Sequence, residues 1–476
     1  MNKKDVSYLS ALMSLFGRNF ITLSGGILAA VSAFFIVSFM LLGMLEIADS
    51  PYIGIMAFLV LPGVFVAGLL LVPAGVVWEH KFGKSSTEDK RPYPAIDFNY
   101  PHTRRVGALV VIFTGFNVLI IGTATFMGVH FMESTEFCGE VCHTVMEPEY
   151  TAYLKSPHQR VACVECHIGP GADWFVKSKL SGLRQVLAVA IDSYPRPIPS
   201  PVENLRPSRD TCEQCHWPAK LTGDRLKIIT KYEEDEENTP MSTVLLLHVG
   251  GGDDGGTGIH SRHINSDMQV YYTSSDYERQ NINRVRVVDA EGKETIYTSG
   301  EENPETASVE YEERMMDCID CHNRPSHIFY LPEEEVNKAL KTGGIDASLP
   351  YIRKTGVEVL TNATGKHGDI EHIREQVLAF YEAAYPDLLE SRKADIDTAI
   401  HKLQDIYKSN VFPDMNVFWG THPMNIGHEK SPGCFRCHNE ELRNEEGKPI
   451  GQDCDGCHTI LAWDESDPEI LETLGH

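Results

Sequence analysis

Cysteine and histidine recur along this chain in one repeated arrangement. Five times, two residues separate a pair of cysteines and a histidine follows directly, and a sixth copy has one extra residue between its cysteines. A Cys-x-x-Cys-His run is the attachment site for c-type haem, in which both thiols form thioether bonds and the imidazole becomes an axial ligand of the iron. The six copies are Cys138, Cys142 and His143; Cys163, Cys166 and His167; Cys212, Cys215 and His216; Cys318, Cys321 and His322; Cys434, Cys437 and His438; and Cys454, Cys457 and His458.

The number of cysteines favours haem over the other uses of such motifs. The chain has 12 cysteines, and the six motifs use all of them, which leaves none for a disulfide. A single motif of this kind is also compatible with a zinc knuckle or a redox dithiol. Zinc ligation, however, does not require a histidine directly after every second cysteine. We therefore expect six covalently attached haem c groups.

Each low-spin haem needs a second axial ligand, so the histidines outside the motifs matter. Seven of them lie near motifs or near glycine-rich turns, which is enough for six distal positions. His260, His263, His327 and His428 are the candidates that position alone favours, and His248 and His422 rank behind them. We expect His367, His372, His401 and His476 to be solvated or capping residues.

Three long uncharged segments precede or adjoin the first motif. We predict transmembrane helices at about 19–45, 51–78 and 106–132, because each segment is long enough to cross a hydrocarbon core roughly 30 Å thick. The last of these contains His130 in its final turn, which we interpret as an interfacial residue or as a haem or quinone contact. The first motif begins six residues after Met132, so its haem is expected at the membrane surface.

Basic residues predict the orientation of these helices. Lysine and arginine precede the first segment and fill the connection between the second and third, whereas the connection between the first and second has none. Because such residues stay on the cytoplasmic side, the amino terminus is expected in the cytoplasm and residues after Met132 in the periplasm. The protein is therefore predicted to be a multi-pass protein of the cell inner membrane.

Charge is distributed unevenly between the membrane segment and the remainder. Residues 1–132 carry nine basic and seven acidic residues, whereas residues 133–476 carry 33 basic and 60 acidic ones. A strongly acidic outer part excludes nucleic acid as an expected partner.

The rest of the chain contains regions with a strand-forming pattern and a region with a helix-forming pattern. Strand-forming residues dominate 226–249 and 269–299, and Ala290-Glu291-Gly292 has the character of a hairpin turn. From 332 to 410, apolar residues recur every three or four positions, which indicates amphipathic helices.

The predicted fold is mostly α: a three-helix transmembrane anchor followed by a periplasmic multihaem cytochrome c domain with a small β insert. The predicted divisions are 1–132 for the anchor, 133–223 for haems 1–3, 224–310 for the β insert, 311–331 for haem 4, 332–410 for a helical spacer and 411–476 for a terminal two-haem segment.

Three motif segments resemble a known family. Phe-Cys-Gly-Glu-Val-Cys-His-Thr-Val-Met, the residues around Cys163, and Leu-Arg-Pro-Ser-Arg-Asp-Thr-Cys-Glu-Gln-Cys-His are similar to the first three haem segments of the NapC/NirT family of membrane-anchored multihaem cytochromes, which includes the NrfH type. The likeness extends from about residue 106 to His322. Two extra helices and two extra motifs exceed the family's usual single-anchor, four-haem plan and are similar to larger inner-membrane cytochromes of anaerobic bacteria.

The resemblance implies roles for particular residues. It implies His158 as a distal ligand and Met146 as an alternative to His143 at the first iron, although the first motif departs from the family spacing by one residue before the histidine and one before the methionine. It also implies a quinol site with a lysine after the second motif, where Lys177 and Lys179 stand. The same lysines, with Arg184, also fit contacts of an interfacial helix with lipid phosphates.

The expected function is electron transfer from quinol. Menaquinol or ubiquinol would be the diffusible substrate, and periplasmic or outer-membrane cytochromes or reductases would accept the electrons during anaerobic respiration. Two alternatives stay open: a quinone-independent electron-transfer subunit of a larger membrane complex, and a terminal multihaem reductase with an open iron position.

Overall fold

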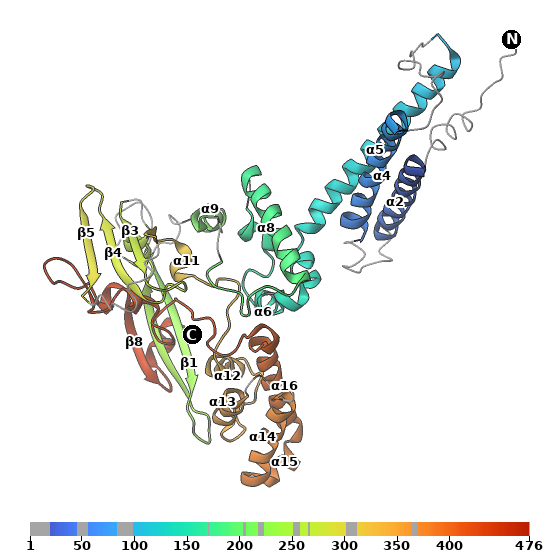
Figure 1. Cartoon of the computed structure of the whole chain (residues 1–476). Coiled ribbons are helices and arrows are strands. Elements are labelled where there is room, and N and C mark those ends of the chain that lie inside the picture. The colour runs from blue at the N-terminus through green and yellow to red at the C-terminus, as the bar shows by residue number, and fades with distance from the viewer. Residues whose placement is uncertain are drawn as a thin grey trace, which may run out of the picture. The chain divides into compact units, whose positions relative to one another are not determined.

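A computed structural model describes residues 20–44, 56–82, 99–169, 171–202, 206–217, 223–250, 258–264, 267–300, 312–363, 365 and 369–475. The chain divides into two compact units, residues 1–143 and 144–476 (Figure 1). The mostly helical fold class predicted from the sequence is confirmed. Two small sheets contain all eight of the described strands.

The first unit contains three helices long and apolar enough to cross a membrane. The spans inside them begin at Phe20, Leu61 and Thr103, so the predicted segments 19–45 and 106–132 agree closely with the observed helices. The predicted start of the second segment, 51–55, lies outside the described residues. The elements of this unit are α2 (Phe20–Met44), the π-helical turn η1 (Met56–Val60), α4 (Leu61–Phe82), α5 (Pro101–Met132) and the π-helical turn η2 (Phe137–Val141).

Small residues let α2 and α4 pack closely. A Cβ atom added at Gly68 would lie 2.7 Å from the backbone nitrogen of Ala29, and one at Gly25 would lie 2.8 Å from the carbonyl oxygen of Gly68. In a membrane, where lipid chains are as apolar as leucine, close backbone approach replaces the hydrophobic effect as the force between helices. Most large apolar side chains of α2, α4 and α5 are correspondingly exposed on the outside of the unit.

The second unit contains short helices around the motifs, two sheets and a helical bundle (Figure 1). The short helices are α6 (His143–Leu154), α7 (Cys163–His167), α9 (Ser208–Cys212), α10 (Ile259–His263), α11 (Cys318–Cys321), η4 (Pro413–Met415), η5 (Gly433–Arg436), η6 (Cys454–Gly456) and α17 (Glu469–Leu474). A longer helix, α8 (Ala172–Ala190), follows the second motif.

The two sheets combine strands that are far apart in the sequence. The predicted hairpin is confirmed, because β4 and β5 pair and Gly292 adopts φ +79°, a conformation that glycine tolerates best. Strands from the carboxyl-terminal segment complete both sheets: β8 pairs with β2, and β7 pairs with β5. The orders are β1 (Asp224–Tyr232), β2 (Pro240–His248), β8 (His458–Glu465) in one sheet, and β6 (Arg314–Met315), β3 (Gln269–Ser274), β4 (Ile282–Val288), β5 (Glu294–Ser299), β7 (Leu442–Arg443) in the other.

The helical bundle forms the largest apolar core of the second unit. Its helices occupy the region where the sequence shows apolar residues every three or four positions, and residues such as Leu360, Ile373 and Leu403 are fully buried in it. The bundle consists of α12 (Pro332–Lys341), α13 (Ile352–Asn362), α14 (Asp369–Ala384), α15 (Pro386–Ser391) and α16 (Lys393–Asn410). Side-chain burial is supplemented by hydrogen bonds such as that from Tyr407 to Asp369, whereas the region around the motifs has few buried apolar residues.

Candidate haem sites

The five regular motifs are all built on short helical segments. The second and fourth motifs form the α-helical turns α7 and α11, the third follows the end of α9 at Cys212, and the fifth and sixth begin in the 3-10 turns η5 and η6. The backbone N–H groups of His216, His322 and His438 donate to the carbonyl of the first cysteine in their motif at 2.8, 2.8 and 3.0 Å. Residues three and four positions apart lie on the same side of such a turn. The two thiols and the imidazole of a motif are therefore presented together, as attachment to one porphyrin requires.

The first motif differs, in line with its extra residue. Cys138 lies in the π-helical turn η2, and π-type turns accommodate one additional residue within a helix. Cys142 is half-buried, and burial raises the pKa of its thiol. Met146 is half-buried on α6, whereas the side chain of His143 lies outside what the structure describes.

Each motif histidine of the other five motifs faces one histidine from outside the motifs. The distance between ring centres is nearly the same in every pair. The pairs are His167 with His327 at 6.2 Å, His216 with His158 at 6.0 Å, His322 with His260 at 6.4 Å, His438 with His263 at 5.8 Å, and His458 with His428 at 6.2 Å.

This separation matches two imidazoles on opposite sides of one metal ion. Metal–imidazole bonds are about 2 Å long and a ring centre lies about 1 Å behind its bonding nitrogen, so two axial rings have centres about 6 Å apart. Direct ring stacking would bring the centres closer, as in the contact of His428 with Phe435 at 4.3 Å. The five pairs therefore fit an iron between the rings of each pair.

Hydrogen bonds orient several of these imidazoles for ligation. The Nδ1 atoms of His327, His263 and His438 contact the carbonyl oxygens of Glu149, Ile259 and Gly451 at 3.0, 2.6 and 2.6 Å. A carbonyl only accepts, so Nδ1 must carry the proton, and Nε2 keeps its lone pair for a metal. His158 makes the same kind of contact with the carbonyl of Pro325 at 3.3 Å.

Burial favours the neutral, ligating form of these rings. His327 is half-buried, and burial lowers the pKa of its imidazole, with Glu149 acting in the opposite direction. Burial also lowers the pKa of His260, with His322 as the second cause. A metal binds the deprotonated ring nitrogen, so a lowered pKa prepares the pair for ligation. By donor set, spacing and protonation, the residues present fit haem c.

The motifs follow one another in space in the same order as in the sequence. Helix α7 of the second motif contacts α9, which ends at Cys212 of the third, and α9 contacts α11 of the fourth. Arg436 of the fifth motif donates to the carbonyl of Asp320 in the fourth at 2.6 Å, and Gln452, shortly before the sixth motif, donates to the carbonyl of His438 at 3.1 Å. The second to sixth motifs thus form a continuous series of neighbours.

Two lysines singled out from the sequence lie on α8. Lys177 is exposed and its Nζ lies 4.5 Å from the centre of the Trp174 ring, while Lys179 is half-buried. The same helix exposes an apolar stripe that includes Leu180, Leu183 and Leu187. Basic residues beside an exposed apolar stripe are typical of a helix at a membrane interface.

The remaining histidine candidates have other surroundings. Both ring nitrogens of His248 are engaged, Nδ1 with Asp224 at 2.9 Å and Nε2 with Thr459 at 3.0 Å. His422 is buried beside Phe329, and burial, with a further contribution from Arg324, lowers its pKa to about 4. Neither ring forms one of the five histidine pairs.

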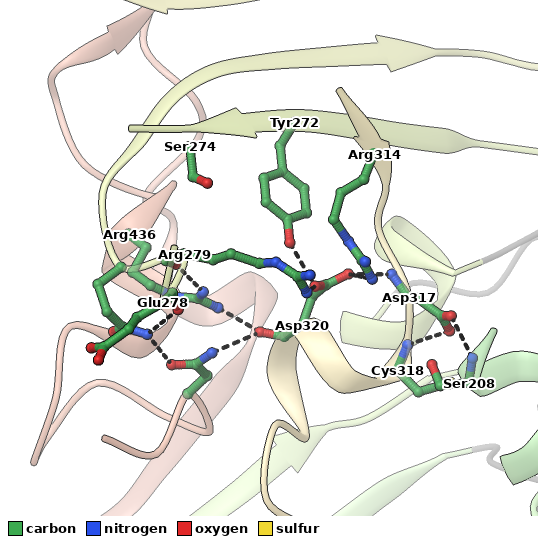
Figure 2. A network of polar contacts seen from close by, with 12 residues as sticks. Ser208, Tyr272, Ser274, Glu278, Arg279, Arg314, Asp317, Cys318, Asp320 and Arg436 are labelled. Carbon is green, nitrogen blue, oxygen red and sulfur yellow. Dashed lines mark hydrogen bonds and ion pairs between the residues drawn. The ribbon is translucent and has the colours of Figure 1, made fainter. Parts of the chain in front are cut away.

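The sequence analysis missed two polar clusters that adjoin these sites. Arg324, nearly buried, donates to both carboxylate oxygens of Glu149 at 2.9 and 2.8 Å and to the carbonyl of His327 at 2.6 Å. The second cluster surrounds Asp320, which lies inside the fourth motif (Figure 2). For the second cluster, the sequence offered one signal: a charged residue immediately before the second cysteine of three motifs, Glu165, Asp320 and Arg436.

Comparisons with known proteins relate the chain to cytochromes c. The model of the NapC/NirT cytochrome c family, N-terminal region, matches residues 101–197. The chain is 43% identical over 449 residues to the cytochrome c-type protein ImcH of Geobacter sulfurreducens (strain ATCC 51573 / DSM 12127 / PCA), a match that covers 93% of this chain and 88% of that relative. No solved structure matches the chain.

Proposed function

Because this chain belongs to the NapC/NirT family of cytochromes c, we propose that it is an inner-membrane quinol dehydrogenase that passes electrons along six covalently bound haems to periplasmic or outer-membrane acceptors in anaerobic respiration. Membership of the family by itself implies membrane-anchored, quinol-linked electron transfer by haem c. The number of haems, the ligands, the quinol site and the orientation are part of the proposal. The observation that carries it is the set of five histidine pairs with ring centres 5.8 to 6.4 Å apart.

The proposed ligands follow from the pairs. The distal ligands of haems 2 to 6 are, in order, His327, His158, His260, His263 and His428. His143 and Met146 are the two candidates at haem 1. A thioether ligand there would raise the potential of that haem relative to a second imidazole.

The bound haems supply one-electron redox chemistry, and the protein supplies ligands, spacing and protection from solvent. If the five histidine pairs hold haem, two imidazoles at each of those five irons would leave no open position there for a reducible substrate. This arrangement supports electron transfer over the terminal reductase alternative.

Lys177 and Lys179 are the proposed quinol contacts. An ammonium group close to a quinol oxygen stabilises the anion formed when a proton leaves, which lowers the barrier to oxidation. The exposed apolar stripe of α8 would let a lipid-soluble quinol reach these side chains.

The proposal is tested with the purified full-length holoprotein in vesicles. Mass analysis should show six haem groups on the chain, and a menaquinol or ubiquinol analogue should reduce haem anaerobically. Each quinol analogue is added in stoichiometric amount, and dithionite serves as the positive control. If dithionite reduces all the haems but neither quinol analogue reduces any, the protein is not a quinol dehydrogenase.

Matched variants separate the two interpretations of α8. Lys177→Gln and Lys179→Gln are compared with Arg184→Gln, which removes a basic side chain from the same helix. If α8 forms a quinol site, quinol-driven haem reduction should be slower than wild type in at least one lysine variant. The rate in Arg184→Gln should equal that of wild type. Equal slowing in all three variants, reversed by added anionic lipid, would instead assign the basic residues to lipid contact.

A further inference from the structure

The fourth and fifth motifs contain oppositely charged residues at equivalent positions. Asp320 and Arg436 each stand immediately before the second cysteine of their motif. Asp320 is only 3% exposed, although it is a carboxylate. Figure 2 shows that the two residues lie in one polar network.

The carboxylate of Asp320 is shared among several donors. The Tyr272 hydroxyl donates to Oδ1 at 2.6 Å, and the backbone N–H of Asp317 donates to Oδ2 at 2.7 Å. Arg314 and Arg279 form ion pairs with the two oxygens at 3.1 and 3.4 Å. Burial, and secondly the charge of Asp320, raises the pKa of Tyr272, so this hydroxyl keeps its proton.

The guanidinium of Arg436 connects the fifth motif to the fourth. Its Nη2 donates to the carbonyl of Asp320 at 2.6 Å, its Nη1 to the carbonyl of Arg279 at 2.8 Å, and its Nε to Gly433 at 2.9 Å. Asn425 donates to the same Asp320 carbonyl at 3.2 Å. The bond to Gly433 fixes the guanidinium against its own turn η5, so the bond to the Asp320 carbonyl restricts the distance between the two motifs.

The network also reaches the third motif. Asp317 caps α11 by accepting from the backbone N–H of Cys318 at 2.6 Å, and its other oxygen accepts from the N–H of Ser208 at 2.9 Å. Ser208 begins α9, which ends at Cys212. Asp317 therefore joins two haem-binding turns, and Asp320 and Arg436 extend the connection to a third.

The two histidines that face the fourth and fifth motifs also belong to one structural element. His260 and His263, which face His322 and His438, both belong to the five-residue helix α10. The fourth and fifth sites consequently share structure on the motif side and on the distal side.

We infer that Asp320 and Arg436 are positioning residues that hold the fourth and fifth haem sites as one unit, with Asp320 supplying a buried negative charge that lowers the reduction potential of the adjacent haem. The inference rests on the proposed attachment of haem at these motifs. A buried charge acts on a nearby iron more strongly than an exposed one, because less solvent screens it. A negative charge favours the ferric form, and burial and nearby charge are recognised means of tuning haem potential.

The first test compares Asp320→Asn with Glu165→Gln by mediated redox titration of the full-length holoprotein. Glu165 holds the same position in the second motif but is exposed to solvent. Asp320→Asn should shift the midpoint of at least one haem to more positive potential, whereas Glu165→Gln should reproduce the wild-type titration. Superimposable titrations for Asp320→Asn and wild type would overturn the electrostatic part of the inference.

A second variant, with an expected potential shift of opposite sign, keeps the test valid if Asp320→Asn fails to assemble. Arg314→Gln removes a positive charge 3.1 Å from the carboxylate, so it should shift a midpoint to more negative potential. An upward shift, or none, would contradict the inference.

The positioning part is tested with Arg436→Lys, which keeps the charge but loses the planar set of donors. Adjacent haems give paired bands in Soret circular dichroism that depend on their relative orientation, and these bands should change in Arg436→Lys. Unchanged bands would mean that Arg436 does not set the geometry. None of these measurements uses quinol as the electron donor, so their outcome is independent of whether quinol is the physiological donor.

Discussion

Glu149 and Arg324 form a buried ion pair whose disruption should be measurable. Arg324 is 6% exposed and donates two hydrogen bonds to the carboxylate of Glu149, which lies on α6. In Glu149→Gln the shape is kept, but the guanidinium stays buried without its counter-charge. Breaking a buried pair on one side costs about 3 kcal/mol or more.

This free energy converts to a moderate change in melting temperature. An unfolding entropy of about 2 cal/mol/K per residue, summed over residues 144–476, gives roughly 0.7 kcal/mol/K. A loss of about 3 kcal/mol then corresponds to a decrease of about 4 °C in the melting temperature of the second unit, measured by circular dichroism on the holoprotein.

Two controls make the prediction specific to the pair. Glu147→Gln changes an exposed carboxylate on the same helix and should shift the melting temperature by less than about 1 °C. The double variant Glu149→Leu with Arg324→Met removes both charges and should recover part of the loss, since replacing both partners is often neutral. If the melting temperature of Glu149→Gln equals that of wild type, the interpretation of Glu149 and Arg324 as a buried, mutually dependent pair is wrong.

Three further outcomes are expected. His263→Met should change the axial ligation of one haem in the ferric electron paramagnetic resonance spectrum, whereas His248→Gln, whose ring bonds to Asp224 and Thr459, should leave the spectrum unchanged; equal spectra for both variants would contradict the assigned pair. Gly68→Leu should destabilise the packing of α2 on α4 and lower the yield of folded protein in the membrane, while Gly63→Leu, at a position with open space around its Cβ, should not; similar yields would refute the close contact. The pKa of His422 is about 4 in the folded chain, below its ordinary value, so the unfolded chain takes up the proton first as pH falls. Its contribution to stability is therefore complete above about pH 6.5 and declines toward pH 4, and His422→Asn should show a flatter dependence of melting temperature on pH over that range; an identical slope would contradict the burial argument.

Much of the site could be predicted from local sequence because its chemistry is local. Cys163, Cys166 and His167 lie within one helical turn, so spacing alone predicts that they face the same porphyrin. Uncharged segments long enough to cross a bilayer are equally local signals, and the three helices of the first unit agree with them. His260, His263, His327 and His428 were recognisable as candidates by type and position, together with His248 and His422, and His158 was implied by the family resemblance.

Only the tertiary structure decided which partner each candidate faces. His327 comes shortly after the fourth motif yet faces His167 of the second, and His158 precedes the second motif yet faces His216 of the third. Spacing cannot predict such pairs, because they depend on how separate turns pack. The same holds for the carboxylate of Asp320: its burial among Tyr272, Arg279 and Arg314 requires strands and loops distant in sequence to meet. The sequence by itself therefore identified the candidate haem ligands and the segments long and apolar enough to cross a membrane, whereas packing between distant segments decided the histidine pairs and the charges beside them.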